Sequence, residues 1–515
     1  MRLMKVHPMG ERQREEVAGR EEPGSVDTFA GRIRVKWTPE SEVSSLGLMP
    51  FFIEFLKTSG LLDKWVKDCP LKYTSPNAPE VRDVLGTILL SVLAGHFRYA
   101  HINAIRGDGV NPQLLGMGKV VSEDSVRRAL IAMDEQASEE WLKQHLKASY
   151  EPLLEERWAM DMDTTVKVLY GHQEDAKVGY NPTKPGRPSH AYHSYFIAKL
   201  RMVLEVEVQA GNQTASSFAQ PELWAFLDGL LPLSRPAFLR GDCGWGTERV
   251  MEGCEQRELG YVFKLKQSPN VKKLIGKLFA QQGWVDAGQQ WQGFESELRL
   301  SGWTRQRRVV VLRRALKQEV VGKRSKRKNK QMTLDLSTEA HQGVEYEYAV
   351  LVTTLPDEAR TIAQHYRDRG DSENNFDELK NQWGWAGFTT HDRKRCQIMA
   401  RINALIYNWW TIFMRLGIPD KHAEAITSRP LALQGIARLT RHANQTTVEI
   451  TSTHSKAPLI AEALNTVSSF LKRIKAIAEQ LTPSTRWRLI LSKAYQVFLR
   501  GKVLGATATL AESSA

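Results

Sequence analysis

The sequence predicts an α/β protein with helical segments on both sides of its α/β core. Residues 157–266 alternate between strand-like runs rich in β-branched side chains and helical runs, which is typical of a sheet covered by helices. Residues 46–144 and those after 397 instead space their apolar side chains three and four apart, as helices do. Residues 284–345 contain further strand-like runs, which predict a β-rich insertion within the core.

The composition favours a nucleic-acid partner. The chain has 515 residues, enough for about three domains. Its 71 Lys and Arg residues outnumber its 58 Asp and Glu residues, and a net charge of +13 suits a polyanion. The four cysteines form no CxxC pair, which favours a reducing cytosol over zinc or disulfides. We expect a cytoplasmic protein, bound to the nucleoid when on DNA. No signal peptide or membrane span is predicted.

Changes in pattern divide the chain into six expected segments. Residues 1–32 are poor in large apolar residues, which predicts a flexible arm. The segments are a flexible arm (1–32), a helical DNA-binding domain (33–150), an α/β core (151–269 and 346–400), a β-rich insertion (270–345), a helical C-terminal region (401–505) and a frayed tail (506–515).

The N-terminal helical segment has a candidate DNA-reading helix. Ser122 can cap a helix over 123–133, whose first turn is acidic. This helix presents Arg127 and Arg128 after a series of short helices and tight turns. The pattern is typical of a helix-turn-helix reader, and equally of an ordinary helical bundle with surface arginines.

Two strands of the predicted core carry aspartates in unusual places. Asp163 lies inside the strand over 157–170, where an acidic side chain needs a partner. Asp161 lies two residues earlier on the same face and competes for the same role. Asp242 ends the strand over 236–242, and ligands collect at the carboxyl ends of strands in open sheets. Taken singly, each aspartate can also be a turn residue or a helix cap.

A row of charged side chains follows on a helix predicted over 363–380. Tyr366, Arg369, Glu373, Asp377 and Lys380 are spaced three, four, four and three residues apart, which places them on one helix face. Such a face is either exposed and laced with salt bridges, or turned inward towards a metal ion and a phosphate. We favour the second interpretation because of the two aspartates.

Three carboxylates that converge from distant parts of the chain need cations. They repel one another unless positive charge intervenes, and hard oxygen ligands favour Mg²⁺ or Mn²⁺. Two such ions activate a nucleophile and stabilise the leaving oxygen in a displacement at phosphorus. Asp163, Asp242 and Glu373 are therefore the predicted catalytic and metal-binding acids.

Two basic stretches are candidates for phosphate contacts. A loop over 179–188, broken by proline and glycine, carries Lys184 and Arg187. A basic run over 323–330 fits a solvated loop, or a contact with DNA.

These motifs resemble those of the DDE transposases of bacterial insertion sequences. Tyr366, Arg369, Glu373 and Lys380 match the Y-x2-R-x3-E-x6-K helix signature of that superfamily without a gap. Residues 162–165 and 240–245 resemble its first-aspartate and second-aspartate strands. Residues 161–166, 170–171, 179–182 and 369–380 look most like the insertion-sequence 1380 group.

The resemblance implies a ribonuclease-H-like core with a β-rich insertion. It assigns Asp163, rather than Asp161, to the metal site with Asp242 and Glu373. It also implies that Tyr366, Arg369 and Lys380 contact phosphates near the cut.

The resemblance gives the insertion a role at the DNA end. In relatives the insertion helps hold a flipped base or a hairpin end, so Trp284, Trp291 and Trp303 are candidates for stacking on DNA, Trp291 above all. Core packing is the alternative for each, because Trp is buried on average.

The expected function is DNA transposition. The enzyme would bind the inverted repeats of its element as a homodimer, cleave them and join the 3′-hydroxyl ends to target DNA. A ribonuclease-H-like nuclease that only cuts, and a transposase-derived regulator that binds DNA without cutting, are the alternatives.

Overall fold

The computed structural model describes most of the chain and confirms the mixed α/β class. It describes residues 24–35, 42–181, 184–316, 345–451 and 454–505. Most of the predicted arm (1–32), the basic run (323–330) and the predicted tail (506–515) lie outside these residues.

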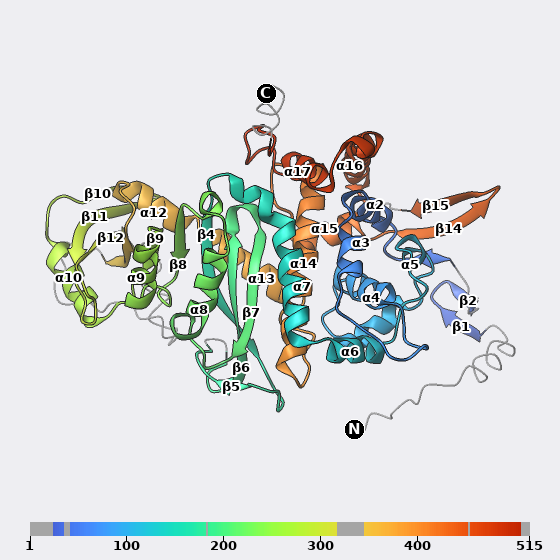
Figure 1. Ribbon diagram of the computed structural model, residues 1–515, viewed down its shortest axis with the longest axis horizontal. Helices are drawn as coiled ribbons and strands as arrows, with labels where there is room; N and C mark the ends of the chain where they lie inside the picture. Colours follow the sequence, from blue (N-terminus) through green and yellow to red (C-terminus); the bar gives the residue numbers. More distant parts are fainter. Residues whose placement is uncertain (1–23, 36–41, 182–183, 317–344, 452–453, 506–515) are drawn as a thin grey trace.

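One large mixed sheet forms the left and centre of the molecule in Figure 1. Its strand order is β10-β11-β12-β13-β9-β8-β4-β6-β5, with β7 paired to β6. Neighbours are antiparallel except that β4 pairs parallel with β8, and β8 with β9. Within the described residues the sheet has ten strands: β4 (Ala159–Val168), β5 (Lys177–Val178), β6 (Pro188–Ile197), β7 (Met202–Ala210), β8 (Phe238–Gly241), β9 (Gly260–Lys264), β10 (Val285–Gly288), β11 (Trp291–Leu298), β12 (Arg307–Ala315) and β13 (Tyr346–Thr353).

The strands of the predicted insertion continue this sheet instead of forming one of their own. β13 pairs with β12 on one side and with β9 on the other, so β10, β11 and β12 extend the core sheet at one edge. The end of the molecule at the left of Figure 1 is therefore a direct extension of the core. The domain limits themselves stay a prediction.

Helices cover the sheet and build the opposite end of the molecule. Ser122 caps α6 as predicted, because its side chain accepts a hydrogen bond of 3.2 Å from the Ser125 amide. No helix in the described part of the chain is long and apolar enough to cross a membrane. The helices are α2 (Met49–Ser59), α3 (Leu61–Lys67), α4 (Val81–Leu93), α5 (Asn111–Leu114), α6 (Glu123–Ala132), α7 (Glu135–Tyr150), α8 (Ala215–Asp228), α9 (Glu248–Gln256), α10 (Pro269–Phe279), α12 (Ala359–Arg367), α13 (Gly370–Asn381), α14 (Arg393–Gly417), α15 (Ala425–Ala432), α16 (Ala457–Ala476) and α17 (Pro483–Ala494). Short 3₁₀ turns occupy Tyr99–Ile105, Glu151–Glu155, Ala198–Leu200, Pro232–Ser234 and Ala478–Gln480.

The long helix α14 joins the two halves of the molecule. It runs through the centre of Figure 1 between the sheet and the N-terminal helices, and it packs along β7 and α7. Nearly every side chain from Cys396 to Leu416 is buried, which is expected of a helix covered on all sides.

Residues 195–208, a strand-like run in the sequence, belong to two strands. The chain leaves β6 at Ile197, turns through Ala198–Leu200 and enters β7 at Met202. Arg201 closes the turn with φ of 58°, a left-handed conformation that ends the strand. The run is apolar on both sides of this turn, because both β6 and β7 are buried strands.

The helix predicted over 363–380 is interrupted. It consists of α12 and α13, which meet at Asp368 and Arg369. The Arg369 amide donates to the carbonyl of Tyr366 at 3.1 Å, a tighter 3₁₀ step than the α-helical one. Gly370 then begins α13, and glycine is a poor residue inside a helix. This 3₁₀ step shifts Tyr366, on α12, relative to Glu373, Asp377 and Lys380, on α13.

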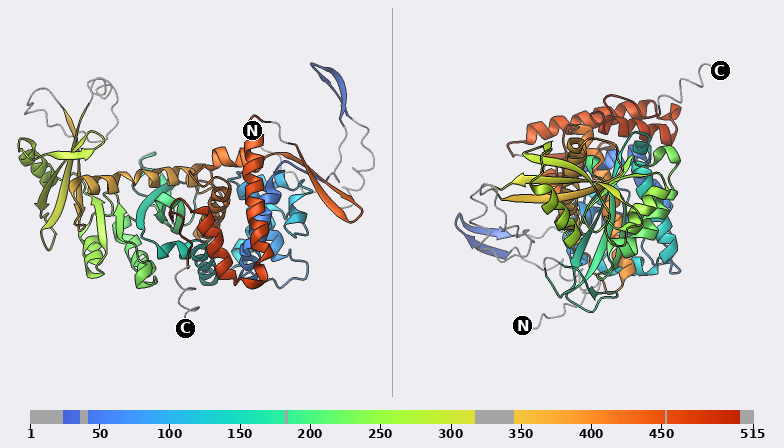
Figure 2. Two further views of the ribbon diagram at one scale, coloured as in Figure 1. Left: turned by 90° about the horizontal axis from the view of Figure 1, so that it is seen from above. Right: turned by 90° about the vertical axis from the view of Figure 1, so that its left-hand side faces the viewer.

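Two β-hairpins stand away from the helical end. β14 (Ile436–His442) and β15 (Gln445–Thr451) form a ribbon that is joined to the body through β3 (Val43–Ser44), and Figure 2 shows it projecting. Its turn, Ala443 and Asn444, has φ of 48° and 62°, as two-residue hairpin turns require. The sequence analysis did not predict this hairpin, because it lacks the usual Asn-Gly or Asp-Gly turn.

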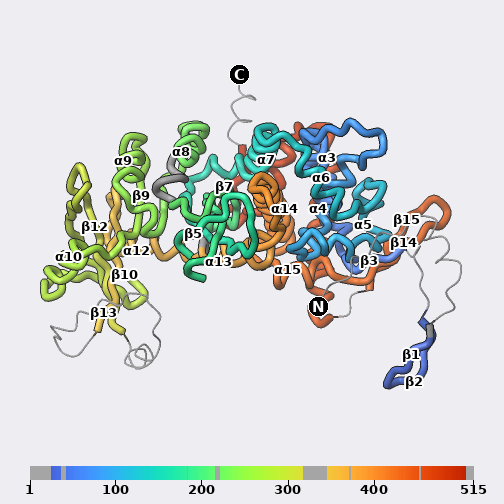
Figure 3. The backbone as a smooth tube through the Cα atoms, turned by 90° about the horizontal axis from the view of Figure 1, so that it is seen from below, coloured from blue at the N-terminus to red at the C-terminus, as the bar shows by residue number. Residues whose placement is uncertain are grey.

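The second hairpin lies near the N-terminus. β1 (Gly24–Thr28) and β2 (Gly31–Val35) pair only with each other, and Figure 3 shows them apart from the body.

A pH dependence of stability follows from a buried histidine at the helical end. His145 on α7 lies 3.1 Å from Asp68, yet burial lowers the pKa of its imidazole to about 4. The unfolded chain takes up a proton near pH 6.5 and the folded one only near pH 4, so this contribution to stability is complete above pH 6.5 and is lost as the pH falls to 4. We expect the free energy of unfolding in urea to fall over this range. The His145→Gln variant should show a shallower fall, and an unchanged slope would contradict the assignment.

Candidate active site

Asp163 and Asp242 lie side by side on neighbouring parallel strands. The register of β4 and β8 pairs Met162 with Gly241, so the two aspartates are the next residues along the two strands. Adjacent strands are about 4.8 Å apart, which brings their side chains to one edge of the sheet. The Asp242 side chain accepts a hydrogen bond of 2.8 Å from the Gly244 amide, in the turn that follows β8.

Glu373 reaches the same place from α13. Arg369 forms an ion pair with Asp163, and its other amino group lies 3.3 Å from a Glu373 oxygen. The Glu373 side chain is 72% exposed, whereas that of Asp163 is 16% exposed. The site is thus buried on the side of the sheet and open on the side of α13.

The electrostatics show that the three acids influence one another. Burial raises the pKa of the Asp163 carboxyl to about 6, Arg369 opposes this rise, and the charges of Asp242 and Glu373 add to it. A carboxyl that is destabilised in its charged form by two neighbouring carboxylates is typical of sites that bind cations.

Asp161 has a different, structural environment. It is fully buried, and its two oxygens accept hydrogen bonds of 2.5 and 2.8 Å from the Arg240 guanidinium. A bidentate pair of this kind occupies both carboxylate oxygens. Asp161 therefore holds β4 to β8, and Asp163 is the aspartate that faces the open site.

The other residues of the predicted row divide between the site and the surface. Tyr366 is half-buried, and the Asp242 charge contributes to raising its phenol pKa after the larger effect of burial. Lys380 is half-buried at the end of α13, and burial lowers its pKa. Asp377 is exposed and accepts a hydrogen bond of 2.7 Å from Asn381. The expectation that all five side chains face inward is wrong for Asp377, because it lies on the solvent-facing side of α13, as does Glu373 one turn earlier.

The carboxylate oxygens of Asp163, Asp242 and Glu373 are of the chemical type that a hard divalent ion binds. As they stand, however, no three His, Cys, Asp or Glu side chains within the described residues are gathered closely enough to hold a metal. The Arg369 guanidinium lies between Asp163 and Glu373 instead. The residues fit an ion provided that Arg369 moves aside, and their assignment as ligands stays a prediction.

The predicted DNA-reading arginines differ in exposure. Arg127 packs its guanidinium 5.2 Å from the Tyr99 ring centre and lies 3.7 Å from Glu123, so it takes part in intramolecular packing. Arg128 is exposed on α6 and available for a partner.

The tryptophans of the insertion all have arginine neighbours. The Arg314 guanidinium stacks 4.8 Å from the centre of Trp291, which is half-buried on β11. Trp284 is half-buried beneath Arg313, and Trp303 is buried in the core. Core packing therefore accounts for Trp303, while Trp291 keeps an accessible edge.

A basic surface at the far end of β4 combines Lys184 and Arg187 with Tyr170. The Lys184 ammonium lies 2.5 Å from the Tyr170 hydroxyl, and the Arg187 guanidinium lies 5.6 Å from its ring centre. The neighbouring acids turn away, because Glu174 accepts a hydrogen bond from the Arg393 amide and Asp175 pairs with the Arg393 guanidinium. We call Tyr170, Lys184 and Arg187 the β4-end surface. Sequence reasoning missed Tyr170, although an aromatic residue near several cations was a usable signal.

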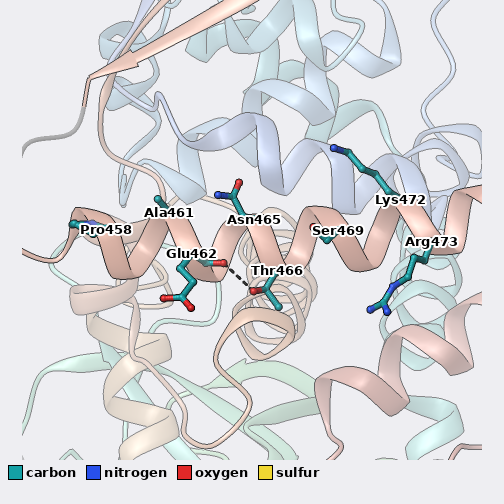
Figure 4. A pocket seen from close by; sticks show the side chains of 8 residues that line it. All are labelled: Pro458, Ala461, Glu462, Asn465, Thr466, Ser469, Lys472 and Arg473. Atoms are coloured by element: carbon teal, nitrogen blue, oxygen red, sulfur yellow. Dashed lines mark hydrogen bonds between the residues drawn. The ribbon is translucent and has the colours of Figure 1, made fainter.

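A pocket on α16 lies away from the predicted catalytic acids. A shallow space of about 850 Å³ borders one face of α16, where Ala461, Asn465 and Ser469 are flanked by Glu462 and Lys472 (Figure 4). Its lining holds no cluster of acids, so we assign the chemistry to the edge of the sheet.

Comparison with known sequences decides the family. Residues 32–471 match the sequence model of the family described as Transposase DDE domain group 1. The chain belongs to this family. It is therefore a DDE-type transposase, and enzymes of this type generally use divalent metal ions.

A solved structure of another transposase is similar to this transposase. The cryo-EM structure of the piggyBac transposase synaptic complex with hairpin DNA aligns with a TM-score of 0.38 and 10% sequence identity, over 88% of this chain and 85% of that chain. None of the curated proteins matches this transposase.

Proposed function

We propose that this transposase cuts DNA at the ends of its own element and joins those ends to new DNA. Hydrolysis of a phosphodiester at the element end yields a 3′-hydroxyl and a 5′-phosphate. The 3′-hydroxyl then attacks a phosphodiester of the target, forms a new phosphodiester and releases a target 3′-hydroxyl. The observation that carries the proposal is the pairing of Asp163 with Asp242 on parallel strands, with Glu373 on α13 beside them.

The finer identity of the enzyme belongs to the same proposal. We infer a ribonuclease-H-like core, membership of the insertion-sequence 1380 group, recognition of terminal inverted repeats and a homodimer that holds both ends. The motif likenesses in the sequence support the first two. The net charge of +13 supports double-stranded DNA as the partner.

Asp163, Asp242 and Glu373 are the side chains that would hold two Mg²⁺ or Mn²⁺ ions. Bound ions of this kind neutralise charge at the phosphate and lower the pKa of the attacking water or hydroxyl. The chain's own part is to supply the acids on a rigid sheet edge and to keep them partly shielded from water.

Cations of α12 and α13 would position the DNA. Arg369 lies against Asp163 and Glu373, and Lys380 is half-buried at the end of α13, so we infer that both meet phosphate oxygens there. A guanidinium suits phosphate in a bidentate contact. The half-buried Tyr366 supports this face from α12.

The Glu373→Gln variant tests the assignment. It is expected to lower both cleavage and strand transfer by on the order of 10³-fold, because a lost metal ligand removes several kcal/mol of transition-state stabilisation. A labelled element end incubated with Mg²⁺ reports nicked and joined products separately. Wild-type transfer by Glu373→Gln would reject the assignment. Nicking without joined products in the wild type would favour the nuclease, and DNA binding without any nicking would favour the regulator.

A second prediction concerns the β4-end surface. If Lys184 and Arg187 each contact one phosphate, changing both to Gln should weaken binding of any DNA sequence and reduce the slope of log affinity against log salt by about two. The matched control is Lys502→Gln, an exposed lysine paired with Glu156 just before β4, which should leave the slope unchanged. Equal slopes for all three proteins, measured by fluorescence anisotropy, would remove this surface from the DNA path.

A further inference from the structure

The Arg369 side chain fills the space that the three predicted acids share. It is only 6% exposed, it pairs with Asp163, and it lies 3.3 Å from Glu373. Burial opposes the charged form of the Arg369 guanidinium, while the charges of Asp163, Tyr366 and Asp242 raise its pKa. One positive charge thus pairs with two of the acids and acts on the third, at a place that is buried at Asp163 and exposed at Glu373.

Two polar groups near this contact are buried without partners. The Arg369 Nε atom makes no hydrogen bond within the described residues, although it is buried. Asn375 on α13, six residues after Arg369, is fully buried, and neither polar atom of its side-chain amide has a partner within the described residues. Burying polar groups without hydrogen-bond partners costs free energy. A shifted position of α13 would therefore satisfy these groups better than the position observed.

A divalent ion and the Arg369 guanidinium compete for the same oxygens. An ion needs lone pairs of Asp163 and Glu373, and these are the atoms that Arg369 holds. Two cations a few ångströms apart also repel each other, and more strongly in a partly buried site than in water. Both therefore cannot hold the acids at once.

We propose that Arg369 is the internal counter-ion of the metal-free site, and that divalent ions bind only as its ion pairs to Asp163 and Glu373 open. Arg369 is then a positioning residue that keeps the acids together before loading and is released towards the DNA phosphates by loading. This inference rests on the proposed function, since it takes Asp163, Asp242 and Glu373 as the metal-binding acids.

Binding of Mn²⁺ to the full chain without DNA tests the competition. Electron paramagnetic resonance of free Mn²⁺ gives the affinity, and thermal unfolding in chelator gives the stability of the metal-free protein. Arg369→Gln should bind Mn²⁺ about tenfold more tightly than the wild type, because the competing cation is gone. Its metal-free form should unfold at a lower temperature and regain stability with Mn²⁺.

Two further variants keep the result interpretable. Arg367→Gln changes a neighbouring arginine that bonds Gln364 instead of an acid of the site, and it should match the wild type. Arg369→Lys keeps the charge but cannot bridge two acids, so it should bind Mn²⁺ about threefold more tightly and still fold if the glutamine variant does not. Wild-type or weaker Mn²⁺ affinity in every folded Arg369 variant would overturn the proposal.

The Asp242→Asn variant separates this inference from the proposed function. Asp242 has no contact with α13 through Arg369 that the substitution would break, yet it is a predicted ligand. If Asp242→Asn binds Mn²⁺ as the wild type does, the metal site itself is misassigned. If Asp242→Asn loses Mn²⁺ binding while Arg369→Gln gains no Mn²⁺ affinity, the metal-site assignment is supported and only the counter-ion role of Arg369 is rejected.

Discussion

Replacing Asp163 by Asn is expected to stop DNA cleavage and joining while leaving the protein folded. The rate should fall by on the order of 10³-fold or more, because the change removes a metal-binding charge that contributes several kcal/mol at the transition state. Folding should tolerate it, because Arg369 keeps Glu373 as a partner at 3.3 Å and because the Asp163 carboxyl is already destabilised in its charged form, with a pKa raised by burial to about 6.

The Asp161→Asn substitution, two residues earlier, is expected to destabilise the fold. Asp161→Asn leaves the buried Arg240 guanidinium without its carboxylate partner. Breaking a buried ion pair from one side typically costs about 3–5 kcal/mol, a large part of a domain's stability. We expect the urea midpoint of Asp161→Asn to fall sharply, while that of Asp163→Asn stays near the wild-type value.

The two variants should be purified together and compared in a strand-transfer assay and a urea titration. A folded, fully active Asp163→Asn protein would refute the role given to this residue. Loss of activity in a stable Asp161→Asn protein would instead move the catalytic role to Asp161.

Local patterns predicted most of the elements around the site. The alternation over 157–266 anticipated β4, β8 and β9, because buried parallel strands are rich in β-branched and apolar residues. The acidic first turn after Ser122 anticipated α6. The pairing of Asp163 with Asp242 also follows from sequence once the two strands are assumed to be parallel neighbours.

Other features depend on contacts between distant residues, which no local pattern contains. Sequence spacing places Arg369 in a row with Glu373, but not between Glu373 and Asp163, which is 206 positions away. The choice between Asp161 and Asp163 was made by resemblance, and the physical reason appears only with the Arg240 pair. The exposed position of Asp377 depends on which face of α13 packs against the core, and the spacing of the charged residues alone does not show this.

The second large effect is expected at the join between the sheet and the helical end. Arg401 of α14 has a side chain that is 1% exposed, and it lies 3.0 Å from Glu205 and forms a second ion pair with Glu207, both on β7. Arg401→Met would leave the two buried acids with only the half-buried Lys143, which lies 3.5 Å from Glu207, as a neighbouring cation. We expect it to lower the free energy of unfolding by about 3 kcal/mol. Lys394→Met, at the half-buried start of the same helix, removes only a hydrogen bond of 3.2 Å to the Ile131 carbonyl and should alter it by about 1 kcal/mol at most.

The sign of the pH dependence identifies the mechanism of that loss. Burial already raises the pKa of Glu207 to about 7 in the wild type, with Arg401 acting against it. Without Arg401 the pKa rises further, so the folded variant holds a proton that the unfolded chain releases above about pH 4.3. The stability of Arg401→Met should therefore recover towards the wild-type value as the pH falls from 8 to 5.

Removing the acids along with Arg401 should restore stability at neutral pH. In the triple variant Arg401→Met, Glu205→Leu, Glu207→Leu, no buried charge is left unpaired, and apolar side chains of similar size fill the same space. Urea midpoints at pH 7.5 should place the triple variant within about 1 kcal/mol of the wild type and well above the single one. A triple variant as unstable as Arg401→Met would show that Arg401 stabilises α14 through packing of its long side chain, and not by neutralising the acids of β7.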